Sequence, residues 1–356
     1  MKYTLYIGTY TQRLPYVDGK GEGIYALELD AQSGALSGLR LAASAANPSF
    51  LALDAPRRRL FAVNELEHWH ARPGGAVSAY RIQADGSLQR VSQRLSGGAA
   101  PCYLSVTPDG GALLAANYAT GTVARLGITP EGSLRSPHPV YGHQGTGPHA
   151  DRQEAPHAHS IAPDPSGRWA LAADLGADKL YIYQLTANSL LPYGALGLRP
   201  GSGPRHFAFS PDGRRLYLAN ELDSTVSFFT FDPDGPHLAH VQMVPALPAS
   251  AAQIENTLAH LVLHPSWRWL YASNRGHDSL AVFNVAADGK LSPAGHVPSG
   301  GRTPRSFALT LDGHWLIALN QDSDSLALFA IDPATGMPVD TGSRVEVPTP
   351  VSVVVD

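Results

Sequence analysis

The sequence predicts an all-β protein, a seven-bladed β-propeller, and three observations lead to that prediction. Two stretches a hundred residues apart, PRHFAFSPDGRRLYLANE (204–221) and PRSFALTLDGHWLIALNQ (304–321), share one pattern. The chain has 35 Gly and 29 Pro in 356 residues, which suits short strands and turns better than helices. Finally, the two ends of the chain match complementary parts of the repeated pattern.

The repeated pattern occurs in six complete units. They open at Pro48, Pro101, Ala158, Pro204, Leu258 and Pro304, and each ends on Asn or Asp, at 64, 117, 174, 220, 274 and 320. Each unit holds two apolar stretches around a turn, which is typical of a β-hairpin. A third apolar strand follows in most units, as at 224–231 and 278–285, and then a turn bearing Gly or Asn. There are seven such turns, so a blade of four strands is expected seven times.

The ends of the chain supply the seventh unit. The last residues, PVSVVVD from Pro350, match PSFLALD from Pro48, and the early residues YTLYIGTY match RLFAVNE from Arg59. We therefore expect the C-terminal strand to be the innermost strand of the blade that the N-terminus builds. Such a ring leaves only short edges unprotected. The prediction is a single propeller domain over residues 1–356.

Composition excludes several classes of function. A formal net charge of −4 and 16% charged residues give no reason to expect a nucleic-acid or anionic-membrane partner. The single Cys102 excludes an internal disulfide framework and a cysteine-based zinc site. No apolar run approaches the length of a membrane helix, and MKYTLYIGTYTQ lacks the features of a signal peptide. A cytoplasmic location is expected.

The repeat also predicts which side chains meet at one rim of the central channel. The first strand of each blade leaves that rim and the second returns to it, so the residue after each opening position lies near the residue after each Asn. Positions that only shaped a blade would look alike, but charge concentrates in four consecutive blades. The residues at these positions that we expect to form the site are His159, Arg205, Glu221, Arg275 and Arg305, with Glu65 and Tyr118 from other blades. The alternative is that Arg and Glu pairs merely fasten neighbouring blades.

Two other features carry weaker signals. The Asn series recurs in nearly every blade, so we interpret it as structural, through turn and inter-strand hydrogen bonds. One insertion, at 136–156, lengthens the link into the fourth blade, and with His157 and His159 it makes a histidine-rich segment. His157 and His159 alternate along a strand and should face one side; with His143 or His149 they could hold a metal. Neighbouring arginines argue against a cation, so no metal is predicted. Whether this loop is a lid or a brace stays open.

Four segments, GPHADRQEAPHAHS, GSGPRHFAFSPDGRRLYLANE, ASNRG and GRTPRSFAL, resemble the lactonase family of seven-bladed propellers. That family includes bacterial 6-phosphogluconolactonase of the propeller type and the fungal carboxymuconate-lactonizing enzyme. The resemblance covers essentially the whole chain. It implies an active site made of one histidine, two arginines and one glutamate, which fall here on His159, Arg205, Arg275 and Glu221.

Lactone hydrolysis suits these residue types. Histidine can take or give a proton near neutrality, with glutamate as its partner or as the base itself. Arginines donate to an oxyanion and grip a phosphate or carboxylate. We expect Arg305, His206 and His157 to add to substrate binding, with Glu65 and Tyr118. No cofactor is expected, and the oligomeric state is not predicted.

The expected substrate is an anionic sugar lactone, and 6-phosphogluconolactone fits best because Arg305 adds a further positive charge. The alternatives are an unphosphorylated aldonic or aldaric lactone, a muconate-lactonizing cycloisomerase, and a non-enzymatic binding scaffold. The direction of the reaction, hydrolysis or lactonization, stays open. No GxSxG, GxxxxGK[ST] or GxGxxG motif occurs to suggest another chemistry.

Overall fold

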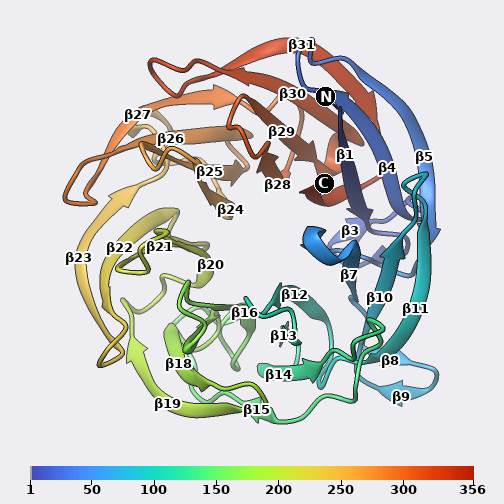
Figure 1. The fold of residues 1–356 in the computed structure, drawn as a ribbon. Coiled ribbons are helices and arrows are strands. Elements are labelled where there is room, and N and C mark those ends of the chain that lie inside the picture. The colour runs from blue at the N-terminus through green and yellow to red at the C-terminus, as the bar shows by residue number, and fades with distance from the viewer. Residues whose placement is uncertain (1) are drawn as a thin grey trace.

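The computed structural model describes residues 2–356 and confirms the seven-bladed propeller. Seven four-stranded antiparallel sheets are arranged in a ring around a central channel (Figure 1). We number the blades from the one that holds the N-terminus. Two short hairpins accompany the blades, β2 (Arg13–Leu14) with β3 (Val17–Asp18) and β8 (His68–Trp69) with β9 (Arg72–Pro73). Three short 3-10 turns complete the chain: η1 (Ala55–Arg57), η2 (Ala249–Ala251) and η3 (Gln321–Ser323).

The strands of each blade follow one another from the channel outward. The innermost strands of blades 1 to 7 are β32 (Pro350–Val355), β6 (Leu51–Asp54), β12 (Pro101–Val106), β16 (Ala158–Pro163), β20 (Pro204–Phe209), β24 (Thr257–Leu263) and β28 (Pro304–Leu309). The second strands are β1 (Lys2–Thr9), β7 (Arg59–Asn64), β13 (Ala112–Asn117), β17 (Trp169–Asp174), β21 (Arg215–Asn220), β25 (Trp269–Arg275) and β29 (Trp315–Asn320).

The outer half of each blade is built in the same order. The third strands are β4 (Gly23–Asp30), β10 (Ala76–Ile82), β14 (Thr122–Gly127), β18 (Lys179–Leu185), β22 (Thr225–Asp232), β26 (Ser279–Val285) and β30 (Ser325–Ile331). The outermost strands are β5 (Leu36–Ser44), β11 (Leu88–Leu95), β15 (Val140–Gly142), β19 (Leu190–Gly197), β23 (His237–Pro245), β27 (Leu291–Pro298) and β31 (Pro338–Glu346).

The ring is closed by the C-terminal strand. In blade 1, β32 pairs antiparallel with β1, with Ile7 opposite Val353, and the sheet order is β32-β1-β4-β5. The innermost strand β32 also contacts the inner strands on both sides, β28 and β6. This is the arrangement that the matching ends of the sequence predict.

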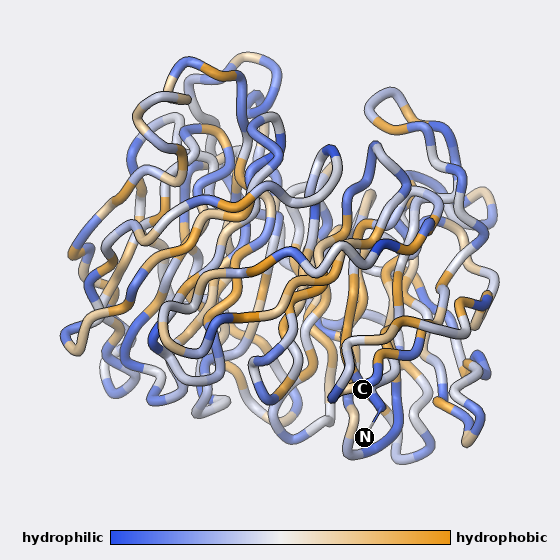
Figure 2. Tube along the Cα trace, turned by 90° about the horizontal axis from the view of Figure 1, so that it is seen from above, coloured by the Kyte–Doolittle hydropathy of each residue, from blue (hydrophilic) through white to orange (hydrophobic). Residues whose placement is uncertain are grey.

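The core lies between the blades. Seven clusters of buried apolar side chains fill the seven gaps between neighbouring sheets. In one of them Tyr217 and Phe228 of blade 5 pack with Phe283 of blade 6. The inner strands of a blade are covered on both faces by the neighbouring blades. Strands such as β21 are therefore apolar nearly throughout, while outermost strands such as β5 are largely exposed. Figure 2 accordingly shows hydrophobic residues in the strands and hydrophilic residues in the turns.

The recurring Asn is structural, as the sequence indicated. The side-chain amide of Asn64 donates to Ala46 O, that of Asn274 to Ala246 O, and that of Asn320 to Ser299 O. In each case the acceptor lies just after the outermost strand of the preceding blade. These bonds fasten one blade to the next at the rim where the second strands end.

Candidate active site

A bulge in the inner strand directs the rim residues into the channel. In blades 3 to 7 the register with the second strand shifts around the residue after the opening position, at Pro101/Tyr103, Ala158/Ser160, Pro204/Phe207, Leu258/Leu261 and Pro304/Ser306. A bulged residue has no partner in the ladder, and bulges re-aim side chains next to functional sites. The skipped residues include His159, Arg205 and Arg305. Each of these three side chains also reaches another blade: His159 lies near Glu221, Arg205 donates to Ala259 O and Arg305 donates to the Tyr10 hydroxyl.

Glu221, directly after β21, is the centre of a buried cluster of charges. Its Oε2 lies 2.8 Å from Arg205 Nε and 3.1 Å from Arg275 Nη2, and its side chain is only 2% exposed. The close contact with Arg205 Nε lacks hydrogen-bond geometry and is an ion pair. His159 Nε2 lies 3.9 Å from the same oxygen. The four residues that the sequence singled out as catalytic therefore meet, although they come from blades 4, 5 and 6.

The charged groups around Glu221 shift one another's pKa values. Burial by itself would raise the pKa of Glu221, but Arg275, Arg205 and Arg152 hold that pKa well below its usual range. Burial, and then repulsion from Arg275, lowers the pKa of Arg205 to about 9. Burial also lowers the pKa of Arg275, and repulsion from Arg305 adds to this shift. At neutral pH these arginines remain charged and repel one another, so a bound anion would be stabilised here.

His159 is neutral at neutral pH. Burial, and then the positive charge of Arg205, lowers its pKa well below the usual range, against the opposing influence of Glu221. Its Nδ1 lies 3.8 Å from the Cys102 sulfur. Burial raises the pKa of Cys102, so the sulfur stays a thiol. A neutral imidazole beside a buried carboxylate is available to accept a proton.

Glu65 lies in a second cluster with residues of blades 1, 2 and 7. Both of its oxygens lie 2.9 Å from the Tyr10 hydroxyl, and Tyr16 of the β2–β3 hairpin donates to Oε1 over 3.0 Å. Ser49 also donates to this carboxylate. Arg305 Nη2 donates to the Tyr10 hydroxyl over 3.0 Å, and its guanidinium lies over the Tyr10 ring. Thus Glu65 is held by tyrosine and serine hydroxyls, and it connects to Arg305 through Tyr10.

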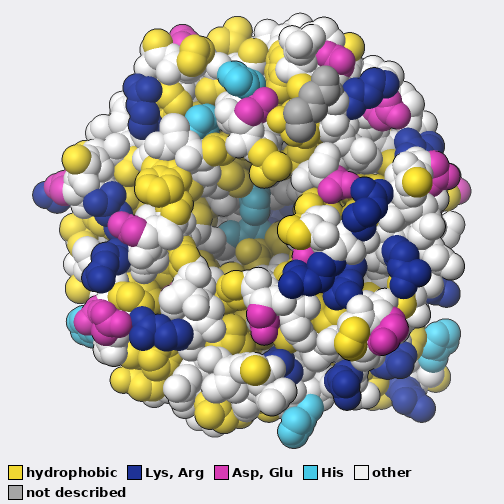
Figure 3. Space-filling view, viewed as in Figure 1, with side chains coloured by type: hydrophobic (Ala, Val, Ile, Leu, Met, Phe, Trp, Pro, Cys, Tyr) yellow, Lys and Arg dark blue, Asp and Glu magenta, His cyan; other side chains and the backbone are white. Residues whose placement is uncertain are grey.

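Histidine and aromatic side chains pack against one another beside these clusters. His206 Nδ1 lies 2.8 Å from His260 Nδ1, and its ring packs edge-on against Phe50 and Tyr103. Burial, and then Arg205, lowers the pKa of His260 to about 3, and the same two causes lower the pKa of His206. Figure 3, which views the face with the termini, shows histidine side chains deep in the central hollow. His260 was missed from the sequence, although it follows Ala259 just as His206 follows Arg205.

Tyr118 and His157 lie beside His159 on the side of blades 3 and 4. The His157 ring stacks on Tyr118 with centroids 4.4 Å apart, and His159 meets the same ring edge-on. The two histidines do not alternate along one strand as expected, because β16 begins at Ala158 and its register shifts there. Both rings nevertheless contact Tyr118. The nitrogens of His157 are 3.0 Å from Tyr118 O and 3.0 Å from Glu154 Oε1. His157 therefore contacts both the ring and the backbone carbonyl of Tyr118 and helps to hold this residue in place.

The structure adds one charged residue that the sequence analysis did not select. Arg152, from the loop before β16, places Nη2 2.6 Å from Glu221 Oε1 and donates from Nε to the Tyr118 hydroxyl over 3.3 Å. The insertion that carries it has no counterpart in the other blades, so the repeat offered no position to compare. Its signals were its place in a loop already singled out for its length and histidines, and in the segment GPHADRQEAPHAHS that carries the family resemblance.

The histidines of that insertion do not form a metal site with His159. His143 Nδ1 is 2.6 Å from Asp174 Oδ2 and its Nε2 is 2.8 Å from the Tyr183 hydroxyl. Among residues 2–356 no group of three or more His, Cys, Asp or Glu side chains is placed to hold a metal ion.

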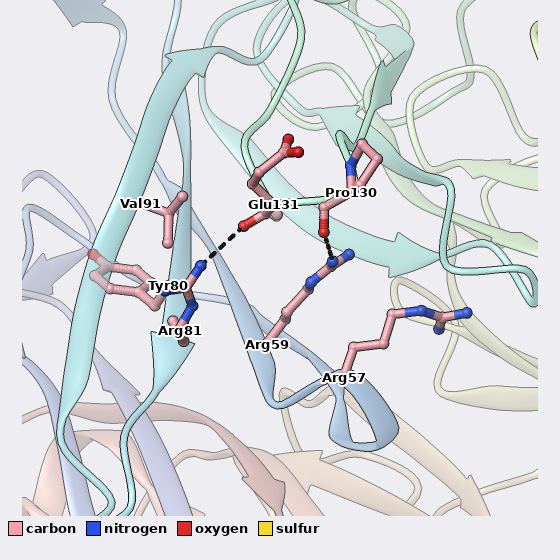
Figure 4. A pocket seen from close by; sticks show the side chains of 8 residues that line it. Arg57, Arg59, Tyr80, Arg81, Val91, Pro130 and Glu131 are labelled. Atoms are coloured by element: carbon pink, nitrogen blue, oxygen red, sulfur yellow. Dashed lines mark hydrogen bonds between the residues drawn. The ribbon is translucent and has the colours of Figure 1, made fainter.

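A separate pocket lies between blades 2 and 3, away from this cluster. Figure 4 shows that arginines line it, and they are already bonded to the neighbouring blade: Arg59 donates to Pro130 O, and Arg81 donates to Glu131 O. These arginines fasten neighbouring blades through backbone carbonyl groups. In contrast, the arginines around Glu221 (Arg152, Arg205 and Arg275) converge on one carboxylate. We call these four residues, with His159, the axial cluster.

Fold and site together define a propeller in which arginines from several blades gather around a buried glutamate beside a neutral histidine. The family model described as "Lactonase, 7-bladed beta-propeller" matches residues 4–355. The 6-phosphogluconolactonase of Bacillus subtilis is 36% identical over 99% of this chain and 98% of its own length. A protein of Formosa agariphila with the same name is 29% identical over 93% of both chains.

Solved structures agree with these relatives. The periplasmic gluconolactonase PpgL of Pseudomonas aeruginosa superposes with a TM-score of 0.92 at 34% identity, over 100% of this chain and 99% of that one. A Lactobacillus plantarum protein gives a TM-score of 0.91 at 30% identity, over 100% of both chains. The chain belongs to the lactonase family of seven-bladed β-propellers, and it is an enzyme of the lactonase class. This assignment favours an enzyme over the binding scaffold that the sequence had left open.

Membrane association was not expected from the sequence. Across residues 2–356, none of the helices has the length and apolar character needed to span a bilayer.

Proposed function

We propose that this enzyme hydrolyses 6-phosphogluconolactone to 6-phosphogluconate at the axial cluster, without a cofactor. The observation that carries the proposal is the charge of that cluster. Together with the Glu65 cluster, it holds four arginines (152, 205, 275 and 305) and two carboxylates, Glu221 and Glu65, which leaves an excess of two positive charges. A phosphate monoester carries a charge of about −1.5 to −2 at pH 7. The two relatives named 6-phosphogluconolactonase support the same substrate.

In the proposed mechanism, water attacks the carbonyl carbon of the lactone ring and His159 takes its proton. The low pKa of His159 keeps the imidazole unprotonated, as this step needs. Because the same low pKa weakens His159 as a base, the step depends on Glu221, whose negative charge stabilises the imidazolium. Arg205 and Arg275 donate hydrogen bonds to the oxyanion, at about 3 kcal/mol for a well-placed donor. The bond between carbonyl carbon and ring oxygen then breaks, and the departing oxygen receives the proton from His159.

Glu221 has a supporting role in this mechanism. Its carboxylate forms ion pairs with three arginines, which depress its pKa, so it is a weak base. We assign it to orienting Arg205 and Arg275 and to stabilising the imidazolium that forms on His159. Arg305, which Tyr10 orients, is assigned to the phosphate.

Unphosphorylated gluconolactone is the second candidate, because the similar structure from P. aeruginosa is named a gluconolactonase. The test is to follow proton release from both lactones in parallel, with spontaneous hydrolysis and ring migration subtracted. We expect a higher kcat/KM for the phosphorylated lactone. Equal values, or a preference for the unphosphorylated one, would assign the second candidate instead.

The role of His159 is tested by His159→Ala. We expect a fall in kcat of about 10²- to 10⁴-fold, since the variant loses the proton-transfer group. A folded His159→Ala protein that turns over the lactone at the wild-type rate would contradict the mechanism.

A further inference from the structure

We propose that Arg152 is a specificity-determining residue, which positions Glu221 with one edge of its guanidinium and binds the phosphate of the substrate with the other. This inference rests on the proposed function of the axial cluster. It goes beyond it by giving the part of the insertion that follows β15, residues 143–157, a role in substrate selection. The argument depends on how this loop is anchored, how Arg152 is bonded and how far it is exposed.

The loop holds Arg152 in place through its neighbour. Gln153 is completely buried and donates from Nε2 to Leu175 O over 2.8 Å, while its backbone N–H donates to His149 O over 2.8 Å. Earlier in the loop, His143 is fixed between Asp174 and Tyr183 and stacks on Tyr181. These contacts anchor the chain on both sides of Arg152, so the backbone of Arg152 is held in a defined position.

Close packing against blades 3 and 4 strengthens this anchor. A methyl group on Gly176 would lie 1.9 Å from Ala155 O, and one on Gly121 would lie 2.5 Å from Pro156 O. Only glycine permits the loop to approach these two strand ends so closely. The loop is therefore a brace rather than a freely moving lid.

Arg152 has donors to spare. A guanidinium has five N–H groups, and the protein contacts of Arg152 use Nη2 for Glu221 and Nε for Tyr118. Its side chain is 35% exposed, compared with 3% for Arg205 and 15% for Arg275. Among the three arginines on Glu221, Arg152 is therefore the most accessible to a ligand that enters from solvent.

The chemistry of the remaining donors selects the ligand. A planar guanidinium offers parallel N–H groups that match the oxygens of a phosphate or carboxylate. Arg152 keeps its charge because Glu221 and Tyr118 raise its pKa against the effect of burial. An uncharged sugar lactone would gain little from this residue. The contact therefore distinguishes phosphorylated from unphosphorylated lactones.

The experiment compares Arg152→Ala, Arg152→Lys and Arg199→Ala with wild type, on 6-phosphogluconolactone and on gluconolactone. Arg199 is a matched control, since its side chain is 63% exposed and its nearest acidic partner, Asp223, is 4.0 Å away. For Arg152→Ala we expect kcat/KM for the phosphorylated lactone to fall about ten- to a hundredfold, mainly through KM, because one charge-assisted contact is lost. The unphosphorylated lactone should lose much less. Arg152→Lys should recover part of the difference, and Arg199→Ala should behave as wild type.

The positioning role has its own readout. Arg152 is one of the charges that depress the pKa of Glu221, so the acid limb of the pH–rate profile should move to higher pH in Arg152→Ala and return in Arg152→Lys. An equal loss on both lactones with an unchanged pH profile would overturn the proposal. So would wild-type behaviour of Arg152→Ala.

Binding of the product separates this inference from the proposed function. Calorimetry with 6-phosphogluconate should show weaker binding to Arg152→Ala than to wild type. If wild type turns over neither lactone but this difference holds, the anion site stands and the proposed reaction fails. Equal binding by the two proteins would overturn the role of Arg152 whichever reaction the enzyme catalyses.

Discussion

The contacts of Glu221 have consequences for stability as well as for chemistry. This side chain is almost fully buried, and three arginines contact its two oxygens. Removing one member of a buried ion pair leaves an uncompensated buried charge, which destabilises a protein far more than losing a surface pair. At this position a residue of the site is also a residue that holds blades 4, 5 and 6 together.

We therefore expect Glu221→Gln to lower the free energy of unfolding by about 3 to 5 kcal/mol. The measurement is denaturant unfolding of both proteins at pH 7. Asp288→Asn is the matched control, because Asp288 pairs with Lys290 on the surface and both side chains are more than half exposed. If Glu221→Gln unfolds at the same denaturant concentration as the control, the cluster is not electrostatically coupled as described.

The histidines of the channel make stability depend on pH. The pKa of His260 is lowered to about 3 in the folded protein, whereas an unfolded histidine titrates near 6.5. Between these values the unfolded chain binds more protons, so stability falls as pH falls, by up to about 1.4 kcal/mol per pH unit for each such histidine. Thermal unfolding from pH 7 to pH 5 should show this slope, and His260→Gln should reduce it. An unchanged slope in the variant would contradict the assignment to His260.

At the scale of elements, the loop before β16 shows how an irregular segment can be placed as firmly as a strand. It follows the short strand β15, and its fixed position comes from buried side chains and from glycines in the turns that it packs against. Packing is intolerant of added volume where no neighbour can give way.

Gly176→Ala should accordingly displace this loop, because the new methyl group would lie 1.9 Å from Ala155 O. We expect a lower Tm and a higher KM for the phosphorylated lactone, since Arg152 moves with the loop. Gly194→Ala is the matched control in the same blade, where nothing lies within 4 Å of the added methyl. Equal KM values for the two variants would show that the loop does not position Arg152.

At the scale of the whole molecule, the ring depends on one pairing between the ends of the chain. Strand β32 pairs with β1 and buries Val351 and Val353. Without it, blade 1 would lose its inner strand and the inner strands β28 and β6 would lose a common neighbour. The exposed edge of β1 would also invite pairing with other molecules.

Deletion of residues 350–356 should therefore abolish cooperative thermal unfolding or leave aggregated protein. Replacing the tip of the β8–β9 hairpin, residues 68–73, with a short Gly-Ser turn is the control, because most of these side chains are exposed. We expect the control to keep a Tm close to that of wild type. A truncated protein that melts cooperatively at the wild-type temperature would show that closure by β32 is dispensable.

The sequence by itself determined the blades, because a propeller repeats its hydrophobic strands and turns at a regular interval and each blade packs only on its neighbours. It also singled out His159, Arg205, Glu221 and Arg275, since these residues depart from an otherwise uniform repeat at one rim. Tertiary structure alone decided the rest. The ion pairs of Arg152, the fixing of Glu65 by Tyr10 and Tyr16, and the pairing of His206 with His260 arise from bulges, an insertion and contacts across the channel. These join residues far apart in the chain, and no periodic pattern encodes such distances.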